Sequence, residues 1–128
     1  MVHLILVRHA KAAPGSPDAG RPLTRSGRHA ATMLGELLAE RSLDAVVSSP
    51  LRRALETAAA IAAAAGLEPL VDDRLAPGAS LEGVRAAVVG RGETVVAVGH
   101  QPDCSEIVLA LTGREVAFPT AGFAEVEL

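Results

Sequence analysis

Short, almost continuously apolar runs that alternate with helical segments constrain the fold of this chain more than any other feature. Residues 2–7, 44–48 and 94–98 lack the apolar–polar alternation of a strand with one solvated face. Strands that are apolar on both sides are typical of a parallel sheet covered by helices on both faces. We therefore predict an α/β fold, a three-layer α/β/α sandwich with a mostly parallel central sheet. Its 128 residues fit a single domain, residues 1–128.

Capping residues set the expected limits of the helices between these runs. Weaker strand patterns at 69–71 and 121–128 complete the sheet, the last of them at an edge. The expected helices run from Thr24 to about Arg41, from Ser49 and Pro50 as N-cap and first residue to Gly66, from Ser80 onward, and from an Asp103–Glu106 capping box to Gly113.

Composition excludes several classes of function. A net charge of −3 offers no general basic surface for nucleic acid or an anionic membrane, and Phe118 and Phe123 are the only aromatic residues. Cys104 is the single cysteine, so no intrachain disulfide can form, which fits a reducing compartment. The N-terminus lacks the pattern of a signal peptide. We expect a soluble cytoplasmic protein with no nucleic-acid or membrane partner, and the sequence leaves its oligomeric state open.

Cationic and titratable residues follow three of the predicted strands. Arg8 and His9 end the first, Arg52 and Arg53 come shortly after the second, and His100 follows "TVVAVG". Because ligands of open α/β sheets bind at the carboxyl ends of the strands, we expect these side chains to converge. A single histidine at a strand end is more often structural, so the prediction of a functional site rests on the convergence of residues from three strands.

Arginines and histidines in one place favour a phosphate group over a metal ion. Guanidinium groups match a dianionic phosphate in charge and geometry, and a helix N-terminus beside Arg53 adds further donors. The same arginines would repel a cation, so we expect no metal and no cofactor. Arg52 and Arg53 point about 100° apart on a helix, so only one should face the site.

Four segments, in order along the chain, resemble the histidine phosphatase superfamily, which has a phosphoglycerate mutase-like fold. They are "LVRHAKA", "RPLTRSG", "SSPLRRALETA" and "VVAVGHQPD". Ala10 stands where many members have glycine. The short length, "RPLT" and "RLAPGAS" are most similar to the SixA-type phosphohistidine phosphatase branch. Thr24 and Gly27 match positions that we interpret as a helix cap and a small residue for close packing.

The resemblance implies a role for each matching residue. His9 corresponds to the nucleophile that becomes phosphorylated, and Arg8 to the arginine beside it that holds phosphate. The pattern selects Arg53, directly before an alanine, as a further phosphate ligand, and leaves Arg52 on a variable, solvent-facing position. His100 matches the second histidine of the phosphate pocket. Arg21 matches an arginine near the phosphate in the SixA branch.

The general acid that many relatives use has no clear counterpart. Four carboxylates are candidates because they lie near the matching segments of the sequence, but each also fits a solvated loop residue or a helix cap. They are Asp18, Asp72, Asp73 and Asp103. An imidazole that is already protonated can leave phosphorus as a neutral group with less help than an alkoxide. We therefore hypothesise that the site favours P–N over P–O bonds.

The resemblance implies a metal-independent phosphatase with a covalent phosphohistidine intermediate. Its expected substrate is a phosphate-bearing molecule, foremost a histidine-phosphorylated protein of a phosphorelay or phosphotransferase system. Two alternatives stay open: a small-molecule phosphomonoesterase of the same superfamily, and a catalytically silent phosphate-binding regulatory module.

Overall fold

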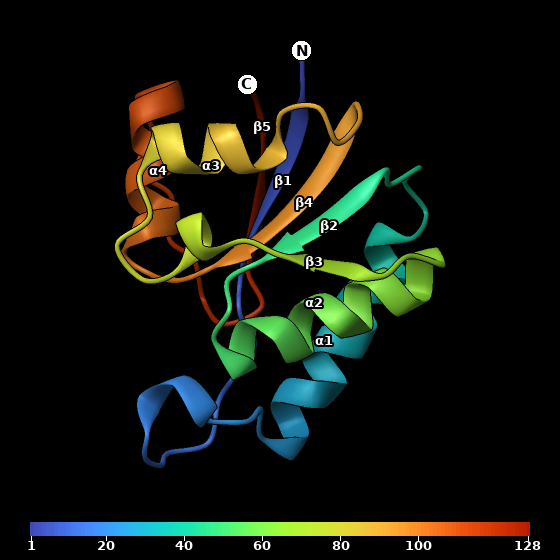
Figure 1. Cartoon of the computed structure of the whole chain (residues 1–128), viewed down its shortest axis with the longest axis vertical. Helices are drawn as coiled ribbons and strands as arrows, with labels where there is room; N and C mark the ends of the chain where they lie inside the picture. The colour runs from blue at the N-terminus through green and yellow to red at the C-terminus, as the bar shows by residue number, and fades with distance from the viewer.

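A central sheet of five strands lies between two pairs of helices (Figure 1). The computed structural model describes residues 1–128. The predicted three-layer α/β/α arrangement with a mostly parallel sheet is confirmed. The strands are β1 (His3–Arg8), β2 (Ala45–Ser48), β3 (Pro69–Val71), β4 (Thr94–Gly99) and β5 (Phe123–Glu127). The helices are α1 (Arg25–Leu38), α2 (Arg52–Ala65), α3 (Leu81–Val88) and α4 (Asp103–Thr112), with 3-10 turns η1 (Asp18–Gly20) and η2 (Asp73–Leu75).

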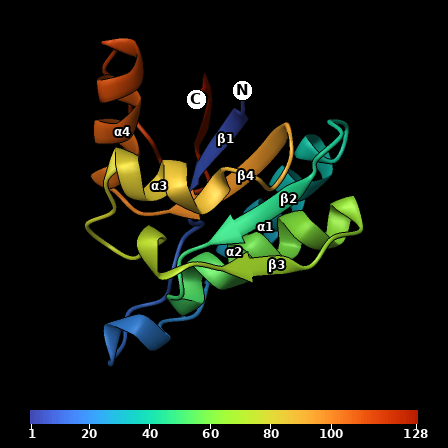
Figure 2. The ribbon, with the colours of Figure 1, turned by 45° about the horizontal axis from the view of Figure 1, so that its top comes forward.

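The strand order explains why helices cover both faces. The order is β3-β2-β4-β1-β5, with parallel pairing from β3 to β1 and antiparallel pairing of β5 with β1 at the edge. The chain moves outward from β1 to β3, then returns to place β4 beside β1. Right-handed crossovers put helices on opposite faces when the direction of travel reverses. Accordingly α1 and α2 lie on one face, and α3 and α4 on the other (Figures 1 and 2).

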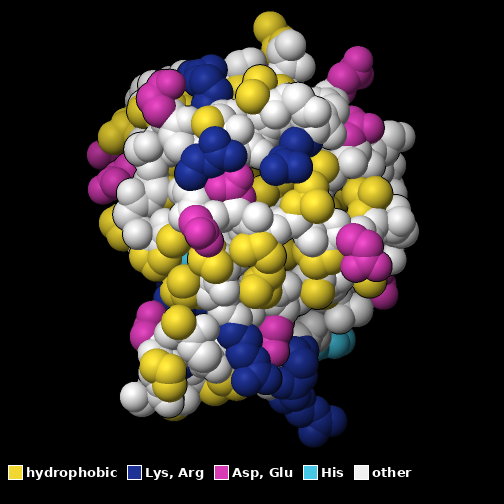
Figure 3. Space-filling view, in the orientation of Figure 1, with side chains coloured by type: hydrophobic (Ala, Val, Ile, Leu, Met, Phe, Trp, Pro, Cys, Tyr) yellow, Lys and Arg dark blue, Asp and Glu magenta, His cyan; other side chains and the backbone are white.

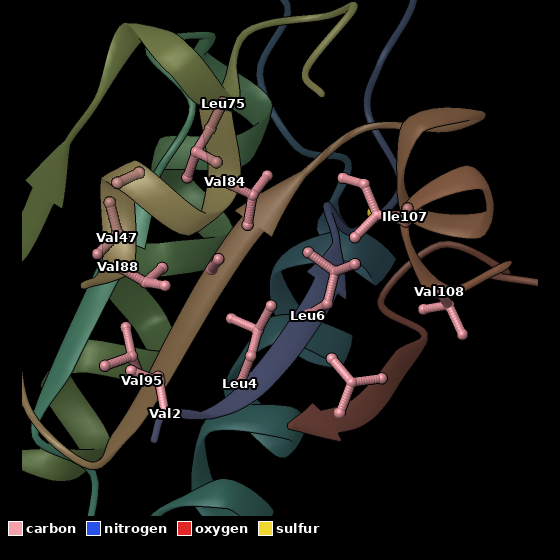
Figure 4. Close-up of a cluster of buried hydrophobic side chains, with 14 of the residues drawn as sticks. Val2, Leu4, Leu6, Val47, Leu75, Val84, Val88, Val95, Ile107 and Val108 are labelled. Atoms are coloured by element: carbon pink, nitrogen blue, oxygen red, sulfur yellow. The ribbon is translucent and has the colours of Figure 1, made fainter. Parts of the chain in front are cut away.

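Alternate residues of β1 feed two separate cores. Leu4 and Leu6 point to the α3–α4 face, whereas Ile5 and Val7 point to the α1–α2 face. All four are at most 2% exposed. Each buried side chain of this size stabilises the fold by about 1.5–3 kcal/mol, which is why the strand is apolar on both sides. Figure 4 shows the first core, where side chains from β1, β2 and β4 pack against Val84, Val88, Ile107 and Val108.

The start of α1 follows the sequence prediction closely. The Thr24 hydroxyl accepts a hydrogen bond from the Gly27 amide at 2.9 Å and caps the helix. A Cβ atom on Gly27 would lie 2.1 Å from the carbonyl oxygen of Lys11, so the expected close packing is real. The helix ends at Leu38, before the predicted Arg41.

The predicted start of α2 is wrong. The helix begins at Arg52, and its N-cap Leu51 is extended. Ser49 is not the cap: its hydroxyl accepts from the Leu51 amide at 3.2 Å in a local turn that holds Pro50 outside the helix. The predicted end is correct, since Gly66 takes the left-handed conformation with φ of 71°.

The predicted capping box of α4 is also wrong. Asp103 is the first helical residue, and its carboxylate accepts hydrogen bonds from the amides of Gly78 (2.9 Å) and Ala79 (3.2 Å). It therefore ties the segment before α3 to α4 instead of capping its own helix. The next residue, Cys104, lies in the core, where burial raises the pKa of its thiol to about 12.

None of the helices combines the length and the apolar character that crossing a lipid bilayer requires.

Candidate active site

Three neighbouring parallel strands end at one level and bring polar residues together. Arg8 at the end of β1 is in register with Gly99 at the end of β4, and Ser48 of β2 is in register with Val98. The ladder continues one step further, because the His9 amide donates to the Gly99 carbonyl at 3.1 Å. His100 follows Gly99 directly. The convergence expected from the sequence therefore holds for both histidines.

The imidazole of His9 is oriented by the backbone. Its Nδ1 lies 2.7 Å from the carbonyl oxygen of Ala10. A carbonyl can only accept, so Nδ1 carries the proton and Nε2 keeps its lone pair in the neutral ring. Burial lowers the pKa of His9; the Ala10 carbonyl opposes this shift, and the charge of Arg53 adds to it. A neutral His9 with a free Nε2 is the form that can act as a nucleophile.

Neighbouring elements hold the backbone around His9. The Ala10 amide donates to the hydroxyl of Thr57 at 3.0 Å, and that hydroxyl donates to the Arg53 carbonyl at 2.8 Å. The Ala121 amide donates to the carbonyl of His9 at 3.1 Å. The end of β1 is thus fixed from α2 on one side and from the segment before β5 on the other.

His100 lies beside His9 and is more deeply buried. The ring centroids are 5.3 Å apart, and the side chain of His100 is 3% exposed. Burial, together with the nearby His9 and Arg53, lowers the pKa of His100 to about 4. Its Nε2 is 2.7 Å from the hydroxyl of Ser49, and its Nδ1 is buried with no partner. His100 is therefore neutral at neutral pH and retains an unused ring nitrogen.

Ser49 is a residue whose contact the sequence interpretation missed. The Ser49–Pro50 pair resembles a helix start, and this local pattern obscured the position of Ser49 beside the end of a buried strand. The available signal was its place directly after β2, one residue beyond the pair Ser48–Val98 and so next to the ends of β1 and β4.

Arg53 is the cation buried deepest in this cluster. It is 8% exposed, and both of its terminal nitrogens contact Asp18: Nη1 donates to the carbonyl oxygen at 3.0 Å and Nη2 to the carboxylate at 3.3 Å. Arg52 points away, as predicted, and pairs with Glu56 at 2.9 Å. The charge of Arg53 lowers the pKa of both site histidines.

Arg8 and Arg21 approach the cluster from two other segments. Nη1 of Arg8 donates to the Phe118 carbonyl at 2.9 Å, while its Nε is buried and unpaired. Arg21 donates through Nε to Ala13 and through Nη1 to Asp18, at 2.8 and 3.0 Å. Both arginines lower the pKa of His9.

Three of the four carboxylates considered as proton donors accept hydrogen bonds; the carboxylate of Asp73 makes none. The Arg21 guanidinium, together with Arg53, holds the pKa of Asp18 below its usual range. The contact with Arg74 does the same for the pKa of Asp72. Asp103 accepts from two backbone amides. The donors beside Asp18 and Asp72 favour the ionised form of these two side chains.

The chemistry of the cluster suits an anion. No three His, Cys, Asp or Glu residues lie together as a metal-binding group. The guanidinium groups of Arg8, Arg21 and Arg53 can instead donate to phosphoryl oxygens. The three hollows on the surface lie elsewhere, the largest, of about 500 Å³, being lined by Ser105, Glu106, Leu109, Glu115, Val116 and Ala117.

Comparison with known proteins places this arrangement in a family. The profile of the histidine phosphatase superfamily (branch 1) matches residues 4–85. An uncharacterised protein of Picosynechococcus is 35% identical, covering 94% of this chain and 82% of its own length. Phosphoserine phosphatase 1 of Hydrogenobacter thermophilus is 38% identical over 59% of this chain, which is 38% of that protein.

A solved structure of the protein histidine phosphatase SixA in complex with tungstate superimposes with a TM-score of 0.88 at 26% identity. The alignment covers 99% of this chain and 88% of that one. The sequence match over more than half of the chain and the shared fold lead to one conclusion: this chain is a phosphatase that belongs to the histidine phosphatase superfamily.

Proposed function

We propose that this phosphatase removes the phosphoryl group from phosphohistidine in another protein, through a covalent intermediate on His9. The observation that carries the proposal is the orientation of the His9 ring: its Nδ1 lies 2.7 Å from the Ala10 carbonyl oxygen, which leaves Nε2 free for phosphorus, and the ring of His100 lies beside it. We assign the nucleophile to His9 and the phosphate contacts to Arg8, Arg21, Arg53 and His100.

In the first step, Nε2 of His9 attacks phosphorus in line with the bond that breaks. The P–N bond of the substrate breaks, and its electron pair stays on the nitrogen of the departing imidazole. This imidazole leaves as a neutral group when its other nitrogen already carries a proton. The Ala10 carbonyl stabilises the positive charge that develops on the His9 ring. Arg8, Arg53 and His100 donate to the three equatorial oxygens, whose charge the loose transition state spreads.

In the second step, water attacks phosphorus and the P–N bond to His9 breaks. The ring recovers its lone pair on Nε2, and inorganic phosphate leaves. The reaction thus consists of two displacements at phosphorus, with His9 as the nucleophile in the first and the leaving group in the second, as in other cases of nucleophilic catalysis.

The state of the carboxylates supports a P–N substrate. A P–O substrate with an alkyl leaving group needs a proton donor, and Asp18 has a lowered pKa because two arginines bind it. A phosphohistidine substrate brings the required proton on its own ring. The absence of a protonated carboxylate therefore costs less for phosphohistidine than for an alkyl phosphate.

The charge around the site supports a protein substrate. We call the cationic residues of segments 8–28 and 49–57 the basic end; these segments hold seven of the twelve Lys and Arg residues, but two of the fifteen Asp and Glu. Figure 3 shows Lys and Arg side chains gathered over the first turns of α1 and α2. The basic end consists of Arg8, Lys11, Arg21, Arg25, Arg28, Arg52 and Arg53. An acidic protein surface around a phosphohistidine would complement it.

A small-molecule phosphomonoesterase is the second candidate. It is favoured by the 38% identity with a phosphoserine phosphatase over 59% of this chain. Its substrate would carry a P–O bond, so the two candidates differ in the bond that breaks and in the size of the leaving group.

One experiment separates the candidates. The protein and a His9→Ala variant are incubated with a histidine-phosphorylated protein, a sugar phosphate and an aryl phosphate, and phosphate release is measured. We expect release from the phosphohistidine protein, lost in His9→Ala and retained in His29→Ala, an exposed helix residue. Release from the sugar phosphate at an equal or greater rate would favour the second candidate. No His9-dependent release from any substrate would favour a silent phosphate-binding module.

A further inference from the structure

A carboxylate occupies the arginines that the proposed reaction needs for phosphate. Asp18 lies in η1, and its two carboxylate oxygens contact different arginines. Oδ1 is 3.0 Å from Nη1 of Arg21, and Oδ2 is 3.3 Å from Nη2 of Arg53. The side chain of Asp18 is 63% exposed, whereas that of Arg53 is 9% exposed. An exposed carboxylate thus neutralises the most buried cation of the site.

We propose that Asp18 is a displaceable counter-ion, a positioning residue that binds Arg21 and Arg53 in the free enzyme and yields them to the phosphoryl group. This inference rests on the proposed function only in assigning those arginines to phosphate. When phosphate leaves, the carboxylate returns to the arginines.

Competition follows from the geometry of the donors. Nη1 of Arg21 and Nη2 of Arg53 each direct an N–H group at the carboxylate of Asp18. A phosphoryl group that approaches the same N–H groups is an anion, and the carboxylate repels it. Because the pKa of Asp18 is lowered, the carboxylate is charged at neutral pH and competes as an anion. A phosphoryl group that binds these N–H groups must therefore displace the carboxylate.

The backbone of the same residue keeps Arg53 aligned during the exchange. Nη1 of Arg53 donates to the carbonyl oxygen of Asp18 at 3.0 Å, independently of the carboxylate. Rotation of the exposed side chain can thus free Nη2 while Nη1 stays in place. The arginine remains oriented for phosphate with or without the carboxylate.

The exchange weakens the binding of every phosphoryl ligand by the fraction of time that the arginines are free. It also weakens the binding of the product phosphate, because the carboxylate of Asp18 competes for the same N–H donors. Removing the charge of Asp18 should therefore strengthen phosphate binding. A purely structural role predicts the opposite, because loss of a structural contact disorders the arginines.

Asp18→Asn tests this prediction with the smallest change of shape. We expect calorimetry with inorganic phosphate to give a dissociation constant about fivefold lower than that of the wild-type protein, the size typical of an exposed ion pair. KM for a phosphohistidine protein should fall by a similar factor, with no rise in kcat. Glu36→Gln, the same charge change on an exposed position of α1, should alter neither.

An unchanged or higher dissociation constant in Asp18→Asn would overturn the inference, as would the absence of phosphate binding in both proteins. Failure of the proposed function looks different. In that case Asp18→Asn would still bind phosphate more tightly, but neither protein would release phosphate from phosphohistidine in a His9-dependent way.

Discussion

The four histidines of this chain share one side-chain chemistry and differ in their surroundings. His3 bonds the carboxylates of Glu127 and Glu125, which raise its pKa. His9 and His100 are buried beside arginines, and their pKa values are lowered. His9 and His100, which we assign to catalysis, therefore favour the neutral form, whereas His3 favours the charged form.

A proton NMR titration of the ring resonances should reveal this difference. On lowering the pH, His3 should protonate first, above 6.5, then His9 below 6.5, and His100 last, near pH 4. Single His→Ala variants assign the signals. A midpoint for His9 at or above that of His3 would contradict the electrostatic description of the site.

Most of the site residues could be predicted from the sequence because buried parallel strands must end at a common edge. Arg8 ends β1, and His9 and His100 directly follow β1 and β4, so their convergence follows from the fold. The contact of Asp18 with Arg53 could not be predicted, since it depends on the path of a loop with no periodic pattern. The bond between Ser49 and His100 was equally hidden, because it joins residues 51 positions apart.

At the scale of elements, the first turn of α1 is locked against the segment that follows β1. The Thr24 amide donates to the Lys11 carbonyl at 2.9 Å, and Gly27 packs against the same carbonyl. This contact fixes how the chain leaves His9 and enters α1. The strands were predictable from their apolar residues. The starts of α2 and α4 were not, because the side chains of Ser49 and Asp103 make tertiary contacts instead of capping these helices.

Gly27→Ala should therefore destabilise the protein in spite of the higher helix propensity of alanine. The added Cβ would meet a backbone oxygen that cannot rotate away, at 2.1 Å before relaxation. We expect a loss of about 1–3 kcal/mol in the free energy of unfolding, typical of overpacking. Urea denaturation measures it, and Thr32→Ala, at an exposed position of α1, serves as the control. Equal stability of Gly27→Ala and wild type would show that α1 shifts freely.

At the scale of the whole molecule, charge is distributed unevenly. The chain has a net charge of −3, yet the basic end belongs to the same two segments that contribute Arg8, His9 and Arg53 to the site. An acidic phosphoprotein would be drawn to that end over distances comparable to the Debye length, about 10 Å at 0.1 M salt. A small neutral-bodied substrate would gain much less from the same field.

Charge reversal at the rim should expose this steering. Arg25→Glu should lower kcat/KM on a phosphohistidine protein by about threefold to tenfold at low ionic strength, with the difference fading in high salt. Turnover of free phosphohistidine should change little. Arg114→Glu, after the far end of α4, is the matched control. An equal loss with both variants would indicate a general effect of net charge instead.

The border of the sheet has a consequence for the behaviour of concentrated protein. β5 leaves one side of its backbone open, and an open strand can recruit another chain and start an aggregate. Glu125 and Glu127 place carboxylates along this strand, bound to His3 and, at Glu125, to Arg41. Because Arg41 and His3 lower the pKa of Glu125 to about 2, that charge persists even in acid. The opposite border, β3, has three residues, too few to template a long partner. The charged side chains of β5 and the short length of β3 thus both oppose edge-to-edge polymerisation of the sheet.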